Sequence, residues 1–295
     1  MKPRLLLHCL AGVAILATRA SAVTLLSDNF SDGDHTNQNL PTSGAWYAAH
    51  AGSTTLSTNG TQQNLLSDSP AASNSQVWTT FANTTIAQGE TLTASFNFDV
   101  SGGANGGVSD GAFRIGLFNV TTPVTANING GIANANWNGA TGYSAFVDVS
   151  PSLNTVATST LRQRTGASDT LWAAAATTGL TTNVSGDETV YTGLTNNVAT
   201  DPLRFLATLS LTRTGADSLN VLLTISGGGI TNTHTLSATD GSGIASTFNT
   251  FSVFSGTSSA QDIAIDNVVI TVVPEPSVLF TAALAPILLG FRRRR

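Results

Sequence analysis

Several stretches of this chain alternate apolar and polar residues with a period of two, the pattern of a β-strand with one buried face. In 92–100, leucine, alanine, phenylalanine and valine alternate with threonine, serine, asparagine and aspartate. Similar stripes occur at 113–117, 203–211, 219–225 and 248–254, and a β-rich stretch covers 263–272. Glycine-rich segments between them are typical of loops. The turn at 214–217 predicts that the stripes on either side of it form an antiparallel hairpin.

The composition agrees with this interpretation, because only 10% of the residues are charged, against about 25% in average soluble proteins. Long surface helices favour Glu, Lys and Arg, so a helical bundle is excluded. Two packed antiparallel sheets are the simplest way for about ten strands to bury one face each. The sequence therefore predicts an all-β fold, an antiparallel β-sandwich in one domain. Weak alternation in 140–197 predicts long connections there.

The first 22 residues have the three parts of a secretory signal peptide. Lys2 and Arg4 form a positive start, an apolar run follows, and Ala20 and Ala22 frame a small-residue cleavage site. We expect cleavage after Ala22. The alternative is an N-terminal membrane anchor, which needs about 20 apolar residues, and Arg19 ends the run too early.

The C-terminus combines a short motif, a brief apolar run and a basic tail. These parts are Pro274, Glu275 and Pro276, then 278–291, then Arg292, Arg293, Arg294 and Arg295. As a helix the run would span about 21 Å, short of the hydrocarbon core of about 30 Å, and Pro286 interrupts it. By the positive-inside bias, the arginines stay cytoplasmic while the body faces outward. This short transmembrane segment suits transient retention in the inner membrane.

The order and spacing of these parts resemble the PEP-CTERM sorting domain of Gram-negative bacteria. The resemblance implies processing by an exosortase, an integral-membrane transpeptidase-like protease, and delivery to the cell surface or the extracellular matrix. The organisation would then be a signal peptide at 1–22, a β-sandwich at 23–273 and a sorting signal at 274–295. An uncleaved C-terminal anchor is the alternative.

The body opens with an Asp-x-Phe motif in 26–30 and closes with Ile-Asp-Asn-Val in 265–268. Together with the strand order, these motifs resemble a concanavalin-A-like jelly roll, the fold of many lectins, carbohydrate-binding modules and glucanases. The resemblance covers roughly 23–273 and implies that the first and last strands are neighbours.

Without the two signals, the body has five basic and sixteen acidic residues, a formal charge of −11. A nucleic-acid partner is excluded, because phosphate neutralisation needs clustered positive charge. Cations and neutral sugars remain as small partners. The single cysteine, Cys9, lies in the signal peptide, which excludes a disulfide, a cysteine nucleophile and a cysteine-ligated zinc site from the body.

An acidic segment near the start of the body is a candidate calcium site. Asp28, Asp32 and Asp34 lie in one loop, and Asp266 of the last strand joins them if the termini pair. Calcium takes six to eight oxygen ligands, which such a loop supplies in part. The alternative is an Asx-rich turn whose carboxylates cap backbone amides.

Aromatic residues are candidate glycan contacts, because their faces are apolar and their edges donate hydrogen bonds. Trp137 lies among asparagines, which indicates a loop, and it is paired with Tyr143 as the expected contact. The alternative places Trp46, Trp78, Trp137 and Trp172 in the core.

Glycoside hydrolysis needs two carboxylates flanking the scissile bond. The body has two glutamates, Glu90 and Glu188, and neither lies in a Glu-x-Asp-x-Glu pattern. We therefore expect no catalytic residues and a non-enzymatic, exopolysaccharide-associated surface or matrix protein that binds carbohydrate. The alternatives are a secreted glycoside hydrolase of the same fold and a purely structural coat or adhesion protein.

Overall fold

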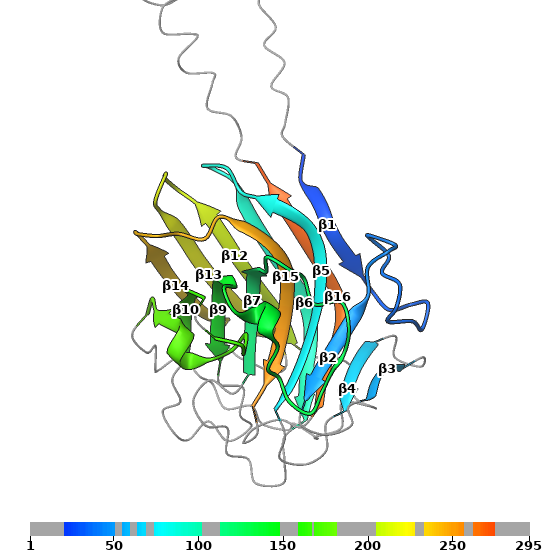
Figure 1. Cartoon of the computed structure of the whole chain (residues 1–295). Helices are drawn as coiled ribbons and strands as arrows, with labels where there is room; N and C mark the ends of the chain where they lie inside the picture. Colours follow the sequence, from blue (N-terminus) through cyan, green and yellow to red (C-terminus); the bar gives the residue numbers. More distant parts are fainter. Residues whose placement is uncertain are drawn as a thin grey trace, which may run out of the picture. The chain divides into compact units, whose positions relative to one another are not determined.

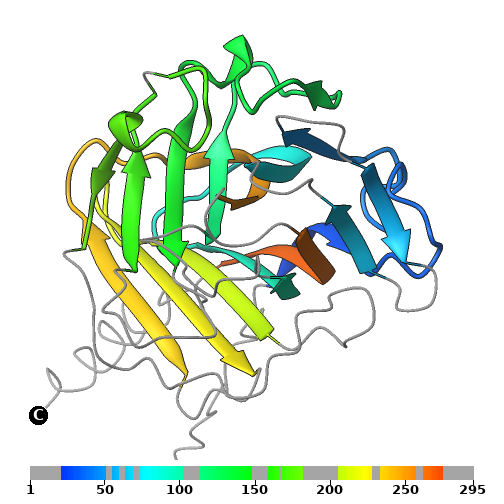
Figure 2. The ribbon, with the colours of Figure 1, turned by 90° about the horizontal axis from the view of Figure 1, so that it is seen from below.

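The computed structural model describes residues 21–50, 55–59, 64–68, 74–101, 113–147, 159–166, 168–181, 205–227, 233–256 and 262–274. Ala22–Glu275 forms one compact unit. Its strands form two facing sheets, with β12, β13 and β14 in one layer and β7, β9 and β10 in the other (Figures 1 and 2). The predicted all-β antiparallel sandwich is confirmed.

Sheet A has eight strands in the described part of the chain, and β1 pairs with β16 beside the main path. In spatial order its strands are β14 (His234–Asp240), β13 (Leu219–Gly227), β12 (Phe205–Arg213), β6 (Thr91–Ser101), β16 (Asp262–Val273), β4 (Asn64–Asp68) and β3 (Thr55–Asn59), with β1 (Val23–Asp28). The predicted hairpin is the β12–β13 pair. The prediction that the first and last strands are neighbours is confirmed, because β1 and β16 form an antiparallel pair (Figure 1).

Sheet B also has eight strands among the described residues. They are β11 (Thr177–Gly179), β10 (Thr160–Arg164), β9 (Thr141–Val147), β7 (Phe113–Asn119), β15 (Thr247–Ser255), β5 (Ser75–Thr85), β2 (Trp46–His50) and β8 (Ile128–Asn129). Short 3₁₀ helices occupy Ala135–Trp137 and Ala174–Ala176. The prediction of long connections throughout 140–197 is wrong, because β9, β10 and β11 lie there. Their alternation is weak because residues on both faces of β9 are buried.

The main core lies between the inner faces of the two sheets. Phe98 of β6 stacks on Phe113 of sheet B at 4.7 Å between ring centroids and on Phe205 of sheet A at 5.2 Å. Phe96 meets Phe251 of sheet B edge-on at 5.3 Å. All these rings are buried, so β6 joins its neighbours and the facing sheet through one aromatic layer.

A second hydrophobic cluster covers the outer face of sheet B. The segments 120–140 and 168–181 place Trp137 and Trp172 over that face, against Trp78 and Phe118. Arg164 of β10 holds the two segments together, since its guanidinium donates hydrogen bonds to the carbonyl oxygens of Trp137, Ser168, Thr170 and Leu171. Burial lowers the pKa of Arg164 to about 10, so it stays charged at neutral pH.

No helix in the described part of the chain is long and apolar enough to cross a membrane. Ala20 of the expected cleavage site, most of the sorting motif and the four terminal arginines lie outside the described residues. The division into signal peptide, body and sorting signal therefore stays a prediction.

We expect Phe98→Ala to lower the free energy of unfolding by about 3–5 kcal/mol, because it removes a ring that contacts both sheets and leaves a cavity. Urea unfolding of the purified protein measures this. Ser95→Ala, on the outer face of the same strand, is the control and is expected to change stability by less than about 0.5 kcal/mol. Equal effects of the two changes would contradict the central role of Phe98.

Candidate functional site

The acidic loop after β1 is built from successive turns in which side-chain oxygens accept backbone hydrogen bonds. Asp28 Oδ1 accepts from the amide of Phe30 at 3.0 Å, and Asp32 Oδ1 accepts from the amide of Asp34 at 3.0 Å. Asp34 Oδ1 in turn accepts from the amide of Thr36 at 2.8 Å. The loop follows the Asx-turn alternative, in which the carboxylates fix the backbone.

Asp28 is the aspartate of this acidic segment that lies inside the protein, with 1% of its surface exposed. Its Oδ2 accepts a hydrogen bond from Trp46 Nε1 at 2.8 Å. Burial first, and then the charges of Asp32 and Asp266, raise the pKa of Asp28 to about 6, although its two hydrogen bonds lower it. The hydrogen bond between the buried carboxylate of Asp28 and the indole of Trp46 thus joins β1 to β2, and therefore sheet A to sheet B.

Asp266 lies at an irregularity of β16 where pairing with β6 shifts register between Asp266 and Val269. Its carboxylate accepts from the amide and side-chain nitrogens of Asn267 at 2.6 and 2.8 Å. Asn267 has a φ of +49°, a left-handed conformation that asparagine tolerates. Asp266 therefore stabilises the bulge, and burial raises its pKa.

This geometry does not show a set of calcium ligands. Among the described residues, no group of three or more His, Cys, Asp or Glu side chains is arranged to hold a metal ion. The oxygens of Asp28 and Asp34 already accept hydrogen bonds from nitrogen or hydroxyl donors. The calcium site at Asp28, Asp32, Asp34 and Asp266 therefore stays a prediction.

The prediction that Trp137 and Tyr143 contact a glycan is wrong. Both side chains are 0% exposed. Trp137, in the segment 120–140, meets Trp78 edge-on at 5.5 Å between ring centroids. The Tyr143 hydroxyl donates to Asp240 Oδ2 at 2.7 Å and accepts from the amide of Ala245 at 3.2 Å, and burial raises its pKa. Trp46 and Trp172 are equally buried, so the core alternative holds for all four tryptophans.

The glutamates and histidines show no arrangement for catalysis in the described residues. Glu90 Oε2 accepts a hydrogen bond from the amide of Ala87 at 2.8 Å, as a turn-capping residue does. Glu188 lies outside the described residues. His35 belongs to the acidic loop, and His234 is a buried residue of β14.

The outer face of sheet A is the surface that the sequence analysis did not single out. Along β14, β13, β12 and the 91–97 part of β6, the described outward side chains are all uncharged, in a body with a formal charge of −11. They are Thr235, Ser237 and Thr239 of β14, Asn220, Leu222, Thr224 and Ser226 of β13, Leu206, Thr208, Ser210 and Thr212 of β12, and Thr91, Thr93, Ser95 and Asn97 of β6.

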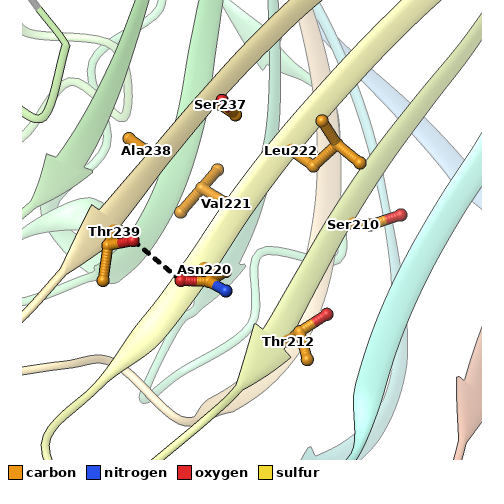
Figure 3. A pocket seen from close by; sticks show the side chains of 8 residues that line it. All are labelled: Ser210, Thr212, Asn220, Val221, Leu222, Ser237, Ala238 and Thr239. Carbon is orange, nitrogen blue, oxygen red and sulfur yellow. Dashed lines mark hydrogen bonds between the residues drawn. The ribbon is translucent and has the colours of Figure 1, made fainter.

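A groove of about 530 Å³ crosses this face over β12, β13 and β14. Figure 3 shows Thr239, Asn220 and Thr212 in one line across the three strands. The next line consists of Ser237, Leu222 and Ser210 (Figure 3). The groove therefore combines hydroxyl and amide groups with an exposed leucine side chain.

Polar side chains on neighbouring strands of this face are joined in hydrogen-bonded pairs. The hydroxyl oxygens of Thr91 and Thr212 are 2.8 Å apart, and Thr239 Oγ1 donates to Asn220 Oδ1 at 2.8 Å. In a hydroxyl pair, one group donates to the other, so the accepting hydroxyl keeps its proton for an outside acceptor. Each pair therefore offers both donor and acceptor capacity. The polar halves of the strand stripes, at Thr93, Ser95 and Asn97, were the sequence signal for this surface.

Comparison with solved structures finds lectins and lectin-like proteins. Peanut lectin with a 9mer peptide is 15% identical, with 86% of this chain and 97% of that chain covered and a TM-score of 0.43. Arcelin-5, a lectin-like defense protein from Phaseolus vulgaris, is 11% identical, with 86% and 99% covered and a TM-score of 0.46. The exoplasmic/lumenal domain of VIP36, in a Ca²⁺/Man3GlcNAc-bound form, is 12% identical, with 77% and 85% covered and a TM-score of 0.40.

No family model matches the sequence, and neither does any curated protein.

We expect the contribution of Asp28 to stability to fall as pH rises from about 4 to about 6. Its pKa is about 6 in the folded protein and near 3.8 when exposed, so in this window the folded state holds a proton that the unfolded state has released, and a rise in pH favours unfolding. Urea unfolding of the protein and of Asp28→Asn across this range measures the effect.

The difference in unfolding free energy, native minus Asp28→Asn, should fall through the window and level off above pH 6. Other titrating groups, such as Asp34 and Asp266, contribute to both proteins and largely cancel in the difference. A difference that stays constant with pH would mean that Asp28 titrates at its ordinary value.

Proposed function

We propose that this protein is an exported, non-enzymatic surface or matrix protein whose β-sandwich binds a neutral polysaccharide on the outer face of sheet A. The observation that supports the binding is the groove over β12, β13 and β14, which contains hydroxyls, an amide and a leucine and lacks charge along its described residues. Export and sorting are proposed from the two terminal sequence patterns.

The chemistry of the groove matches that of an uncharged sugar. Sugar hydroxyls donate and accept hydrogen bonds, and the pair formed by Thr239 and Asn220 leaves the Asn220 amide nitrogen able to donate to a ligand. Leu222 is 39% exposed and offers apolar surface to the C–H faces of a sugar ring. Anionic polymers are disfavoured because the body has a formal charge of −11.

Binding without hydrolysis follows from the same residues. A glycosidase needs two carboxyl groups within about 5–10 Å of each other, on either side of the bond that breaks. The residues that line the groove are Ser210, Thr212, Asn220, Val221, Leu222, Ser237, Ala238 and Thr239, and none is acidic. A polysaccharide in this groove would be held and not cut.

The proposed sorting pathway uses both ends of the chain. The signal peptide at 1–22 directs export, and the sequence from Pro274 to Pro276, the apolar run and the arginines retain the exported body until an exosortase cuts it. The final location would be the cell surface or extracellular matrix of a Gram-negative bacterium, where neutral exopolysaccharide is available to the outer face of sheet A.

We expect Leu222→Asp to weaken polysaccharide binding by about tenfold or more, because it removes an apolar contact and introduces a desolvated charge, and about 1.4 kcal/mol corresponds to tenfold. Native electrophoresis of the purified protein in gels containing dextran, galactomannan or hydroxyethyl cellulose measures binding as retardation. Alginate gels provide the anionic comparison.

Leu40→Asp is the matched control, because Leu40 is an equally exposed leucine, at 42%, outside the groove. It should leave retardation unchanged. Retardation in alginate equal to that in the neutral gels, equal effects of the two variants, or no retardation in any neutral gel would each overturn the binding proposal.

We expect deletion of 274–295 to release the folded body from the inner membrane into the periplasm or the medium, because the deletion removes the apolar run and the arginines that retain it. Cell fractionation and immunoblotting of the producing bacterium measure the location, and urea unfolding of the truncated protein checks that it folds. A folded truncated protein that stays on the cell surface like the full chain would overturn the sorting proposal.

A further inference from the structure

The uncharged surface of sheet A extends well beyond the groove, in rows that run across the strands. One row places Ser237, Leu222, Ser210, Thr93 and Thr271 in register over β14, β13, β12, β6 and β16. Neighbouring strands are about 4.8 Å apart, so five strands span about 19 Å. A single sugar ring therefore occupies only a small part of this surface.

Parallel rows repeat the same chemistry. Where β12 meets β6, three successive rows each contain a close pair of hydroxyls, one from each strand. The pairs are Thr91 with Thr212 at 2.8 Å, Thr93 with Ser210 at 3.3 Å, and Ser95 with Thr208 at 3.4 Å. Same-face residues of one strand are about 6.8 Å apart. The pairs thus form a regular line of donor and acceptor groups beside the groove.

We propose that the outer face of sheet A takes an extended stretch of neutral polysaccharide, which runs across the strands from the groove to the hydroxyl pairs of β6. This inference rests on the proposed function and specifies its ligand as a polymer segment of several sugar residues. A single hydrogen bond on an exposed surface contributes little. Repeated contacts along one chain add up, because each later contact forms within the same molecule.

A second copy of this protein is the other occupant that such a face suggests. The cores of protein–protein interfaces are rich in aromatic and other apolar residues. The described outward positions of β6, β12, β13 and β14 include two apolar side chains, Leu206 and Leu222, and no aromatic ring. The hydroxyl content of this face therefore favours a polyhydroxylated partner over a second copy. The experiment below also measures self-association.

The test measures how affinity depends on the length of the ligand. Titration calorimetry of the full-length protein uses cello-, malto- and laminari-oligosaccharides from disaccharide to hexasaccharide, together with their parent soluble polymers. In the series that binds, affinity should rise by about tenfold or more from disaccharide to hexasaccharide, because only the longer chain reaches β6 from the groove.

Two sets of variants test the groove and the surface beyond it separately. Thr93→Val with Thr271→Val removes hydroxyls outside the groove and should weaken the hexasaccharide several-fold while leaving the disaccharide unchanged. Asn220→Ala, inside the groove, should weaken both. Thr85→Val is the matched control, because Thr85 is an exposed threonine of sheet B whose hydroxyl lies 2.9 Å from that of Thr247 on the neighbouring strand, and it should change neither.

The outcomes separate this inference from the proposed function. A disaccharide that binds as tightly as the hexasaccharide, or an unchanged hexasaccharide affinity in the Thr93 and Thr271 variant, overturns the extended site and leaves polysaccharide binding in place. Failure of every oligosaccharide and polymer to bind overturns both. A dimer in analytical ultracentrifugation that Leu222→Asp dissociates shows that the face binds a second copy, and this overturns the inference.

Discussion

Phe98 lies between two other phenylalanine rings, one from each sheet, and the sandwich depends on this aromatic contact. Phe113 belongs to sheet B and Phe205 to sheet A, with centroid distances of 4.7 and 5.2 Å. Burial of the inner side chains of β6 against β7 and β12 determines which residues must point outward. Because side chains alternate along a strand, Thr93, Ser95 and their neighbours are left on the outer face.

The outer faces of the two sheets differ in what lies on them. On sheet B the segments 120–140 and 168–181 fold back over the strands, and Arg164 donates hydrogen bonds to their carbonyl oxygens. Trp137 and Trp172 thereby become core residues of a second cluster. The described outer face of sheet A has instead a groove over β12, β13 and β14, lined by side chains that hydrogen-bond readily in water. Ligand binding is therefore proposed for sheet A and not for the aromatic face.

The carboxylates of the acidic loop stabilise the fold. The carboxylate oxygens of Asp28, Asp32 and Asp34 accept hydrogen bonds from backbone amides. Asp28 also accepts a hydrogen bond from the indole of Trp46. The cost of burying Asp28 is seen in its raised pKa. The buried contact fixes the end of β1 beside β16 and close to sheet B, so the same residue that weakens the protein at neutral pH also positions its first strand.

The sequence by itself determined the strand class, the inner faces of β6, β12 and β13, the β12–β13 hairpin and the neighbourhood of the terminal strands. The first three depend on local alternation and turn residues, which can be read along the chain, whereas the last is what the resemblance to a jelly roll implies. Only the tertiary structure decided that Trp137 and Tyr143 are buried, that β9 and β10 are strands, and that Asn220 meets Thr239 in a groove. The physical reason is that burial and lateral register depend on segments far apart in sequence, which cover or align with a strand without leaving a local pattern in it.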